Sequence, residues 1–567
     1  MSQTRKTGIW FILAVVLTAF VGCAPKAVRV TYRKPEYKQE KVNARKIILE
    51  GEKKGYDHAF RFEKYGITKY EGPKTCLQCH KTIRVKNPET GKWEDVNTME
   101  NVTESVHMKW YSIPAYTYNV HGEKEKLPMG MIDRACGIPG AQAGVAWALQ
   151  IKNQKDGKIY FEGCGQCHIG GTYGPPVYRM MREVSPMGKI TKNEKESVDC
   201  LICHAKEYDI SKKIVVKDKN GLRWAEDRSL KAAVSVGKPT TWNCRLCHDH
   251  NFVGDNGKGN VKTAAGTRSI VHQYVKRGSP YTPEEDVHAA AGMNCLDCHK
   301  TYGHFIAKGK KTCDLVANDL PNVDVTCEQC HTAQPHKKNE DVADILNMHT
   351  EKLSCTACHV TGLPDNNIRY NDWKHPVFED GFYVPKPTIK GGTKGVIAFK
   401  WFNGTGGLMA TPNGDRKDPK SKITPFKIFN AMMAEDSHNA KPDQQGWILS
   451  FDPVTYMEEG NPEKAIDVAQ DNPYMRMFYG LPMKFMFMNQ LAYDLGYKTW
   501  DNSYYKRPKN DRYFWTDMRS DGYLMLDHSI KAKGRSCNEC HSKDSILNFK
   551  QLGYSADEIE SLQEPRE

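Results

Sequence analysis

Cysteine and histidine recur in one fixed arrangement along this chain. The pentapeptide Cys-x-x-Cys-His occurs eight times, whereas this composition would give about 0.02 occurrences by chance. Two cysteines at this spacing can bond the two vinyl groups of one porphyrin, and the adjacent histidine can then bind the iron. The spacing therefore predicts eight covalently bound haem c groups.

The members of the eight motifs have separate predicted roles. Haem attachment is predicted at Cys76, Cys79, Cys164, Cys167, Cys200, Cys203, Cys244, Cys247, Cys295, Cys298, Cys327, Cys330, Cys355, Cys358, Cys537 and Cys540. Proximal iron ligation is predicted for His80, His168, His204, His248, His299, His331, His359 and His541. A disulfide framework would not require a histidine after each pair, and zinc ribbons would not be confined to this pentapeptide. Only Cys23, Cys136 and Cys313 are left unassigned.

The other histidines are numerous enough to supply a second ligand to every iron. Three of them come six to nine residues before a motif: His288, His349 and His528. His304 and His336 each follow a proximal histidine by five residues. Positions this close to a motif predict distal iron ligands. In contrast, we interpret four histidines as ordinary surface or core residues, namely His121, His250, His375 and His438.

The N-terminus has the pattern of an export signal. Arg5 and Lys6 precede an apolar stretch, which ends at Gly22 and Cys23. The stretch is short for a membrane span, so a secretory signal over residues 1–22 is the better interpretation. A cysteine directly after it resembles the lipidation site of bacterial lipoproteins, and Ala24 favours outer-membrane sorting. The alternative is plain secretion without lipid at Cys23.

The net charge needs correction for the predicted cofactors. The chain contains 81 Lys and Arg against 68 Asp and Glu, a formal charge of +13. The signal peptide removes two positive charges, and each ferric haem adds about −1 through its two propionates, which leaves about +3. The basic excess is thus mainly compensation for propionates, and nucleic acid is excluded as a partner. A polytopic membrane protein is excluded as well, because the single long apolar run lies at the N-terminus.

Beyond the motifs, residues 56–555 resemble the octahaem c-type cytochromes of the tetrathionate reductase type. The resemblance is carried by segments such as VGKPTTWNCRLCH (236–248), DVHAAAGMNCLDCH (286–299) and LNMHTEKLSCTACH (346–359). The long interval between Cys355 and Cys537 also fits the family. The resemblance implies His58, His107 and His272 as further distal ligands.

In that family the second haem is the active site, which here would make His168 a catalytic iron ligand. Cys136, in the segment DRACGIPG, has the place of a cysteine near the family's substrate. The alternative for Cys136 is a small buried apolar residue. The family also has an axial lysine shortly after the motif. This chain instead reads GGTYGPPVYRMM there, and its next lysine is Lys189.

The expected fold is mainly α with extensive loops, a multihaem cytochrome c fold in which eight stacked covalent haems form the core. We divide the chain into a signal peptide (1–22), a lipidated N-terminus and tether (23–56), a seven-haem region (57–365), a haem-poor region with helices (366–525), and an eighth-haem region with a C-terminal tail (526–567). Apolar spacing predicts helices at 425–434, 463–469, 474–493 and 557–562. Brief strands are expected at 160–161 and 213–216.

Two functions are compatible with these features. The first is an exported, outer-membrane electron-transfer cytochrome that conducts electrons along haems with two histidine ligands. It would face the periplasm or the cell exterior, exchange electrons with other multihaem cytochromes or quinol-linked donors, and is compatible with a homo-oligomer. The second is a reductase of tetrathionate or of a nitrogen compound such as nitrite or hydroxylamine, with the second haem as its active site.

Overall fold

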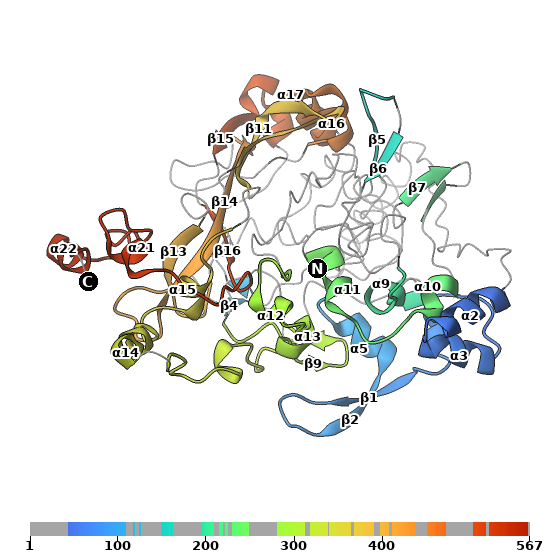
Figure 1. The fold of residues 1–567 in the computed structure, drawn as a ribbon. Helices are drawn as coiled ribbons and strands as arrows, with labels where there is room; N and C mark the ends of the chain where they lie inside the picture. The colour runs from blue at the N-terminus through green and yellow to red at the C-terminus, as the bar shows by residue number, and fades with distance from the viewer. Residues whose placement is uncertain are drawn as a thin grey trace, which may run out of the picture.

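The computed structural model describes most of the chain in segments. The described residues are 44–108, 117–118, 124–125, 149–157, 159–162, 195–196, 198–208, 215–218, 221–224, 230–248, 281–311, 318–337, 340–363, 368–389, 397–406, 411–437, 449, 451–471, 503–517 and 521–564. Figure 1 shows short helices along the lower part of the molecule and a sheet beside them.

The first described segment is a small helical unit. Its helices are α2 (Ala44–Lys53), α3 (Asp57–Lys64) and, from later in the chain, α10 (Leu230–Val234). Gly51 allows these helices to approach closely, because a Cβ at this position would lie 2.9 Å from the Ala59 Cβ and 3.2 Å from Val234. The buried side chains of Ile48 and Ala59 complete this core. The unit fixes α3, which carries one of the predicted distal histidines.

Most of the motifs begin in or lie within a short helix. These helices are α4 (Pro73–Cys76), α9 (Cys200–His204), α11 (Thr241–His248), α13 (Cys295–Cys298), the 3₁₀ turn η3 (Cys327–Gln329), α15 (Cys355–His359) and α21 (Cys537–His541). Residues three apart in a helical turn lie on the same face, so both cysteines of a motif point to the same side. The residue before the first cysteine often starts the turn, as in the capping boxes of Asn294 with Asp297 and of Ser536 with Glu539.

The haem-poor region contains a six-stranded sheet around one long strand, β14 (Lys422–Asp436). The N-terminal half of β14 pairs antiparallel with β13 (Ile397–Phe402) and β16 (Gly522–Met525). Its C-terminal half pairs antiparallel with β15 (Tyr513–Asp517) and parallel with β11 (Ile368–Glu379). The edge strand β12 (Phe382–Ile389) pairs antiparallel with β11.

The predicted helix at 425–434 was wrong, because these residues lie inside β14. The segment PFKIFNAMMA has apolar residues at spacings of three and four, which led to the helix prediction. However, the strand is buried almost continuously from Ile423 to Ile428. A strand covered on both faces carries a near-continuous apolar run, which periodicity alone cannot separate from a buried helix. The expectation of a mainly α fold therefore holds only in part.

Other predicted elements are confirmed by the structure. Helix α17 (Pro462–Gln470) covers the predicted 463–469, and α22 (Ala556–Leu562) covers 557–562. Strand β6 (Ile159–Glu162) includes 160–161, and β7 (Val215–Asp218) overlaps the predicted 213–216. The predicted helix at 474–493 lies outside the described residues.

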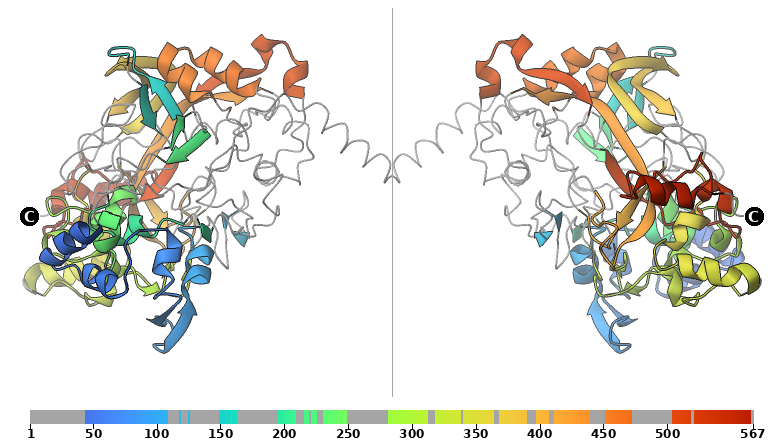
Figure 2. Two further views of the ribbon diagram at one scale, coloured as in Figure 1. Left: turned by 90° about the vertical axis from the view of Figure 1, so that its right-hand side faces the viewer. Right: turned by 90° about the vertical axis from the view of Figure 1, so that its left-hand side faces the viewer.

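The remaining elements are short. The β1–β2 hairpin (Thr82–Lys86, Trp93–Asn97) projects from the body (Figures 1 and 2). The others are α5 (Thr98–Glu104), β3 (Thr117–Tyr118), β4 (Lys124–Glu125), β5 (Leu149–Lys152), β8 (Gly221–Trp224), α12 (Val287–Ala290), β9 (Thr301–Tyr302), β10 (Phe305–Ile306), α14 (Glu340–His349), α16 (Pro453–Glu459), α20 (Ser503–Lys506) and η6 (Lys509–Asp511). None of the described helices combines the length and apolarity needed to cross a membrane.

The central position of β14 can be tested by truncating one of its buried side chains. Phe426 is fully buried and packs edge-on against Phe402 and Tyr523. Phe426→Ala should lower the free energy of unfolding by about 3–5 kcal/mol, measured by denaturant titration. Phe378 of β11 is 51% exposed, so Phe378→Ala should cost about 1 kcal/mol or less. Equal losses in the two variants would contradict this packing.

Candidate haem-binding centres

Seven predicted proximal histidines each face a second imidazole in the structure. We number the candidate sites 1 to 8 by the order of their motifs in the chain. The facing pairs and their ring-centre distances are His58–His80, 6.1 Å; His204–His304, 6.3 Å; His107–His248, 6.1 Å; His299–His528, 6.3 Å; His288–His331, 6.2 Å; His336–His359, 6.3 Å; and His349–His541, 6.1 Å. These pairs belong to sites 1, 3, 4, 5, 6, 7 and 8 respectively.

This separation fits an iron bound between the two rings. A metal–imidazole bond of about 2 Å, plus about 1.1 Å from the nitrogen to its ring centre, places two facing centres about 6.2 Å apart. Other ring pairs in the described part of the chain have centre distances from 4.8 to 6.4 Å, whereas these seven imidazole pairs all fall within the narrow range expected for a bridging iron. The residues present therefore fit one haem iron in each of the seven pairs.

Closeness in sequence does not identify which proximal histidine a distal histidine faces. His288 comes shortly before the fifth motif but faces His331 of the sixth. Likewise His349, just before the seventh motif, faces His541 of the eighth. The same exchange occurs for His304, His336 and His528. A segment with the attachment motif of one haem thus carries the distal histidine of another site, so the sites are linked through the chain.

The second ring nitrogen of several proximal histidines is held by the backbone. In four sites Nδ1 lies 2.8–2.9 Å from a carbonyl oxygen: His204 with Gly237, His299 with Ala307, His359 with Lys531, and His541 with Leu562. A proton on Nδ1 donates this hydrogen bond, which leaves Nε2 deprotonated and able to bind iron. The backbone therefore selects both the tautomer and the orientation of the ring.

Three distal histidines are held by side chains instead. The Nδ1 atoms of His304 and His336 lie 3.1 and 3.2 Å from the amide oxygens of Asn101 and Asn347. The Nδ1 of His288 lies 3.2 Å from the carboxylate oxygen Oδ1 of Asp286. Sequence reasoning missed these three partners. For Asp286 a signal existed, because an aspartate before the short run VHAA is typical of a helix N-cap.

Burial also favours the form of histidine that binds iron. Desolvation lowers the pKa of His107, and it lowers the pKa of His304 to about 4, helped by the nearby His204. The pKa of His204 is lowered for the same reason. A neutral imidazole is the species that coordinates a metal, so these rings do not need to lose a proton before binding.

One helix presents an uncovered apolar face on the side of its ligand histidine. In α14, Val342, Ile345 and Leu346 are 41%, 47% and 37% exposed. They share a helix face with His349, because residues three, four and seven positions apart lie together. His349 faces His541 across the separation described above, so this apolar face borders site 8. A porphyrin held there would cover it.

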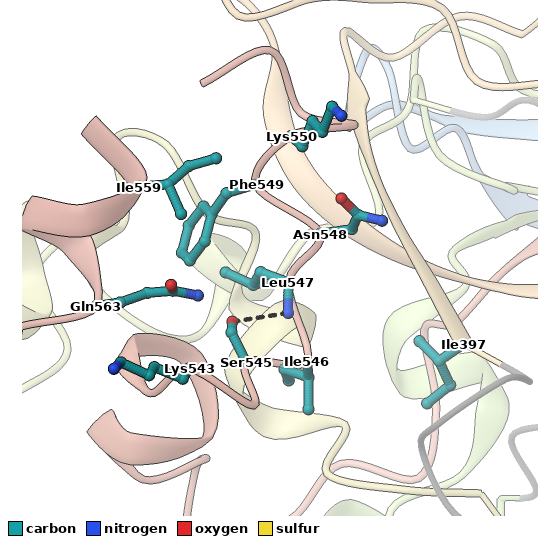
Figure 3. A pocket seen from close by; sticks show the side chains of 10 residues that line it. All are labelled: Ile397, Lys543, Ser545, Ile546, Leu547, Asn548, Phe549, Lys550, Ile559 and Gln563. Carbon is teal, nitrogen blue, oxygen red and sulfur yellow. Dashed lines mark hydrogen bonds between the residues drawn. The ribbon is translucent and has the colours of Figure 1, made fainter. Parts of the chain in front are cut away.

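A cavity of about 440 Å³ lies next to the eighth motif. Figure 3 shows its lining, which mixes apolar side chains such as Leu547, Phe549 and Ile559 with polar ones. The serine-capped loop over 545–547 shapes one wall, where the Leu547 N–H donates to Ser545 Oγ at 3.0 Å. Lys543 and Lys550 also line the cavity. Their charges suit the carboxylate groups that a haem carries at its edge.

The described sites form a continuous series. The side chains of the first cysteines Cys76 and Cys200 lie close to each other, which makes sites 1 and 3 neighbours. The distal rings of sites 3 and 4, His304 and His107, interact electrostatically. Cys295 N donates to Thr241 Oγ1 at 3.3 Å, which joins site 5 to the helix of site 4.

The series continues to the C-terminus. Cys298 and Cys330 are close enough to interact electrostatically, which joins sites 5 and 6. The side chains of Cys327 and Cys355 lie close to each other, which makes sites 6 and 7 neighbours. Arg535, whose side chain is only 1% exposed, donates to the Val360 carbonyl and to Glu539, which joins sites 7 and 8. Figure 1 shows the helices α9, α11, α13, α15 and α21 following one another from right to left.

Several predicted residues lie outside the described part of the chain. These are the second motif with Cys164, Cys167 and His168, the predicted distal ligand His272, Cys136, and the lipidation residue Cys23. The histidines at 121, 250 and 438 are outside it as well. In contrast, His375 is described, and its exposed ring hydrogen-bonds to Asp372 at 2.8 Å.

Comparison with known proteins gives matches on two segments and along most of the fold. The family model "Cytochrome c bacterial" matches residues 403–544, which include the eighth motif. The model "Cytochrome c554 and c-prime" matches residues 243–332, which include the fourth to sixth motifs. An uncharacterized protein of Archaeoglobus fulgidus is 26% identical over 275 residues, covering 44% of this chain and 79% of its own. An octaheme cytochrome c from Shewanella oneidensis aligns with a TM-score of 0.49 and 19% identity, covering 87% of this chain and 95% of its own.

The pairing of His304 with His204 can be tested by removing the distal ring. His304→Ala should convert one low-spin haem into a high-spin haem that binds carbon monoxide, because one axial position opens. Optical and electron paramagnetic resonance spectra would detect the change. His375→Ala is the matched control and should leave the spectra unchanged. If both variants keep the parent spectra, His304 is not an iron ligand.

Proposed function

We propose that this chain conducts electrons along eight covalently bound haems. The chain is a multihaem c-type cytochrome and thus a protein of haem-based electron transfer. The observation that carries this proposal is the set of seven facing imidazole pairs. Each pair would hold one haem iron between two histidines, and the second motif would hold the eighth, with His272 as its distal ligand. When bound, each haem supplies an iron that alternates between the ferric and ferrous states.

The residues around these pairs are suited to electron transfer. Two imidazoles would bind each iron, so the ligands would not have to change when an electron arrives or leaves. The Nδ1 hydrogen bonds hold the rings in one orientation, which limits reorganisation around the iron. The contacts between successive motifs keep the sites adjacent. The path would run through sites 1, 3, 4, 5, 6, 7 and 8 in that order.

A second candidate function is reduction of tetrathionate, nitrite or hydroxylamine at site 2. One observation favours it: the seven other proximal histidines already face an imidazole, so a substrate could reach iron only at His168. In this function Cys136 would contact the substrate, and the other haems would deliver electrons. The chain departs from the family pattern where an axial lysine is expected, which favours the first proposal.

The proposed location is the outer membrane, facing the periplasm or the cell exterior. Export would follow from the signal over residues 1–22, and a lipid on Cys23 would anchor the mature chain. The basic segment between Cys23 and the start of α2 at Ala44 would separate the haem array from the lipid. Other multihaem cytochromes or quinol-linked donors are the proposed redox partners, and a homo-oligomer is compatible with this arrangement.

The two candidate functions differ in the number of irons that can bind an added ligand. Electron conduction predicts eight six-coordinate, low-spin haems and no binding of cyanide or carbon monoxide, because both axial positions of every iron are filled. Optical and electron paramagnetic resonance titrations of the full-length protein would measure this. One ligand-accessible haem would contradict the first proposal. Cys136→Ala should then impair reductase turnover, whereas unchanged kinetics would remove this thiol from the mechanism.

The lipid anchor can be tested separately. Cys23→Ala removes the only thiol at the predicted processing site, so the protein should move from the membrane fraction to the soluble fraction and take up no labelled fatty acid. Cys313→Ala serves as the control, because it changes a cysteine far from the signal. Membrane association of the Cys23→Ala variant would contradict lipidation at this residue.

A further inference from the structure

Asp286 is a buried carboxylate that joins two neighbouring candidate sites. Asp286 is only 2% exposed to solvent. Oxygen Oδ1 accepts from the backbone N–H of His288 at 2.8 Å and lies 3.2 Å from the ring atom Nδ1 of the same residue. Oxygen Oδ2 accepts from Ile530 N at 2.9 Å, two residues after His528. Asp286 therefore contacts the distal ligand of site 6 and the segment carrying the distal ligand of site 5.

The chemical type of this partner distinguishes His288 from the other ligand rings whose Nδ1 contacts are described. Seven ligand rings have the Nδ1 partners described above, and six of these partners are neutral oxygens of a carbonyl or an amide. Only His288 has a carboxylate. The nearby cation Lys531 forms its ion pair with Glu285, at 3.0 Å. Within the described part of the chain, Asp286 therefore has the His288 ring as its side-chain partner and no lysine or arginine.

A negative charge at this position acts on the iron through the imidazole. A carboxylate that accepts the Nδ1 proton increases the basicity of the ring, and a more basic ring donates more electron density to the metal. The ferric iron carries one more positive charge than the ferrous iron, so it gains more from a nearby anion. Because the carboxylate is buried, water screens this interaction only weakly. Both effects stabilise the oxidised state.

We propose that Asp286 is a positioning residue that gives the haem of site 6 a lower reduction potential than it would have with a neutral partner. His299 of site 5 and both ligand rings of site 7 have neutral Nδ1 partners, so they lack this lowering effect. This inference rests on the proposed ligation of site 6 by His331 and His288. It does not depend on whether the protein conducts electrons or reduces a substrate at site 2.

The decisive variant is Asp286→Asn in the full-length, haem-loaded protein. Asparagine keeps one oxygen for the hydrogen bonds from His288 and removes the negative charge. Its amide nitrogen replaces the oxygen that accepts from Ile530 N, so the variant also loses that backbone contact. In a redox titration followed by electron paramagnetic resonance, we expect one haem to become easier to reduce. At the potential where the parent site is half reduced, its ratio of reduced to oxidised iron should rise about tenfold, which corresponds to 59 mV for one electron.

The reciprocal variant is Asn347→Asp at site 7. Asn347 Oδ1 lies 3.2 Å from the Nδ1 of His336, the same distance as in the pair of Asp286 and His288. With a carboxylate there, the ratio of reduced to oxidised iron in one haem should fall about tenfold at the potential where the parent haem is half reduced. This variant tests the same physical effect even if Asp286→Asn impairs haem incorporation.

A purely structural role for Asp286 gives a different result. Its replacement would then lower the unfolding temperature, while every haem kept its midpoint reduction potential and its spectrum. That result, or an unmoved midpoint in Asn347→Asp, overturns the proposal. A carbon monoxide-binding haem would contradict the proposed electron conduction, but it would leave these two midpoint shifts unaffected, so the two failures are distinguishable.

Discussion

The arrangement of this protein depends on one distance, the 6.1–6.3 Å between facing imidazole centres in seven pairs. One ring of each pair is placed by its own motif, in which a single helical turn sets the histidine beside two cysteines. The other ring comes from a different segment. Because that segment usually carries a motif of its own, every pair ties two parts of the chain together. An iron bound in such a pair would hold the fold as well as carry electrons.

The sheet of the haem-poor region has a place in this arrangement. Its central strand β14 begins at the seventh motif, where Ser354 N donates to the Ile423 carbonyl and Ile423 N donates to the Lys352 carbonyl. Strand β16 pairs with β14 and ends at Met525, so His528 follows directly and faces His299 of site 5. The sheet therefore connects the segment of site 7 to the segment that carries the distal histidine of site 5. It then leads on to the last motif and site 8.

Polar side chains supply the finer control of the ligand rings. Neutral carbonyl and amide oxygens orient most of the rings whose Nδ1 contacts are described, and Asp286 adds a charge at one of them. Asp319 shows a related role, because its carboxylate accepts from Val106 N at 2.9 Å and from Ile306 N at 3.4 Å. These residues adjoin His107 and His304, so one carboxylate fixes two ligand segments. Such contacts link chain segments that lie about 200 residues apart.

The sequence alone predicted the attachment residues and the proximal histidines, because their spacing is local and lies within five consecutive residues. It also indicated which other histidines are candidate ligands, since several lie within nine residues of a motif. Only the tertiary structure decided which rings face each other, because those partners meet across long stretches of chain and nearest neighbours in sequence serve different sites. The tertiary structure likewise showed Asp286, Asn101 and Asn347 as partners of ligand rings. It also showed that residues 425–434 lie in a strand, although their apolar spacing fits a helix, because the strand is buried on both faces.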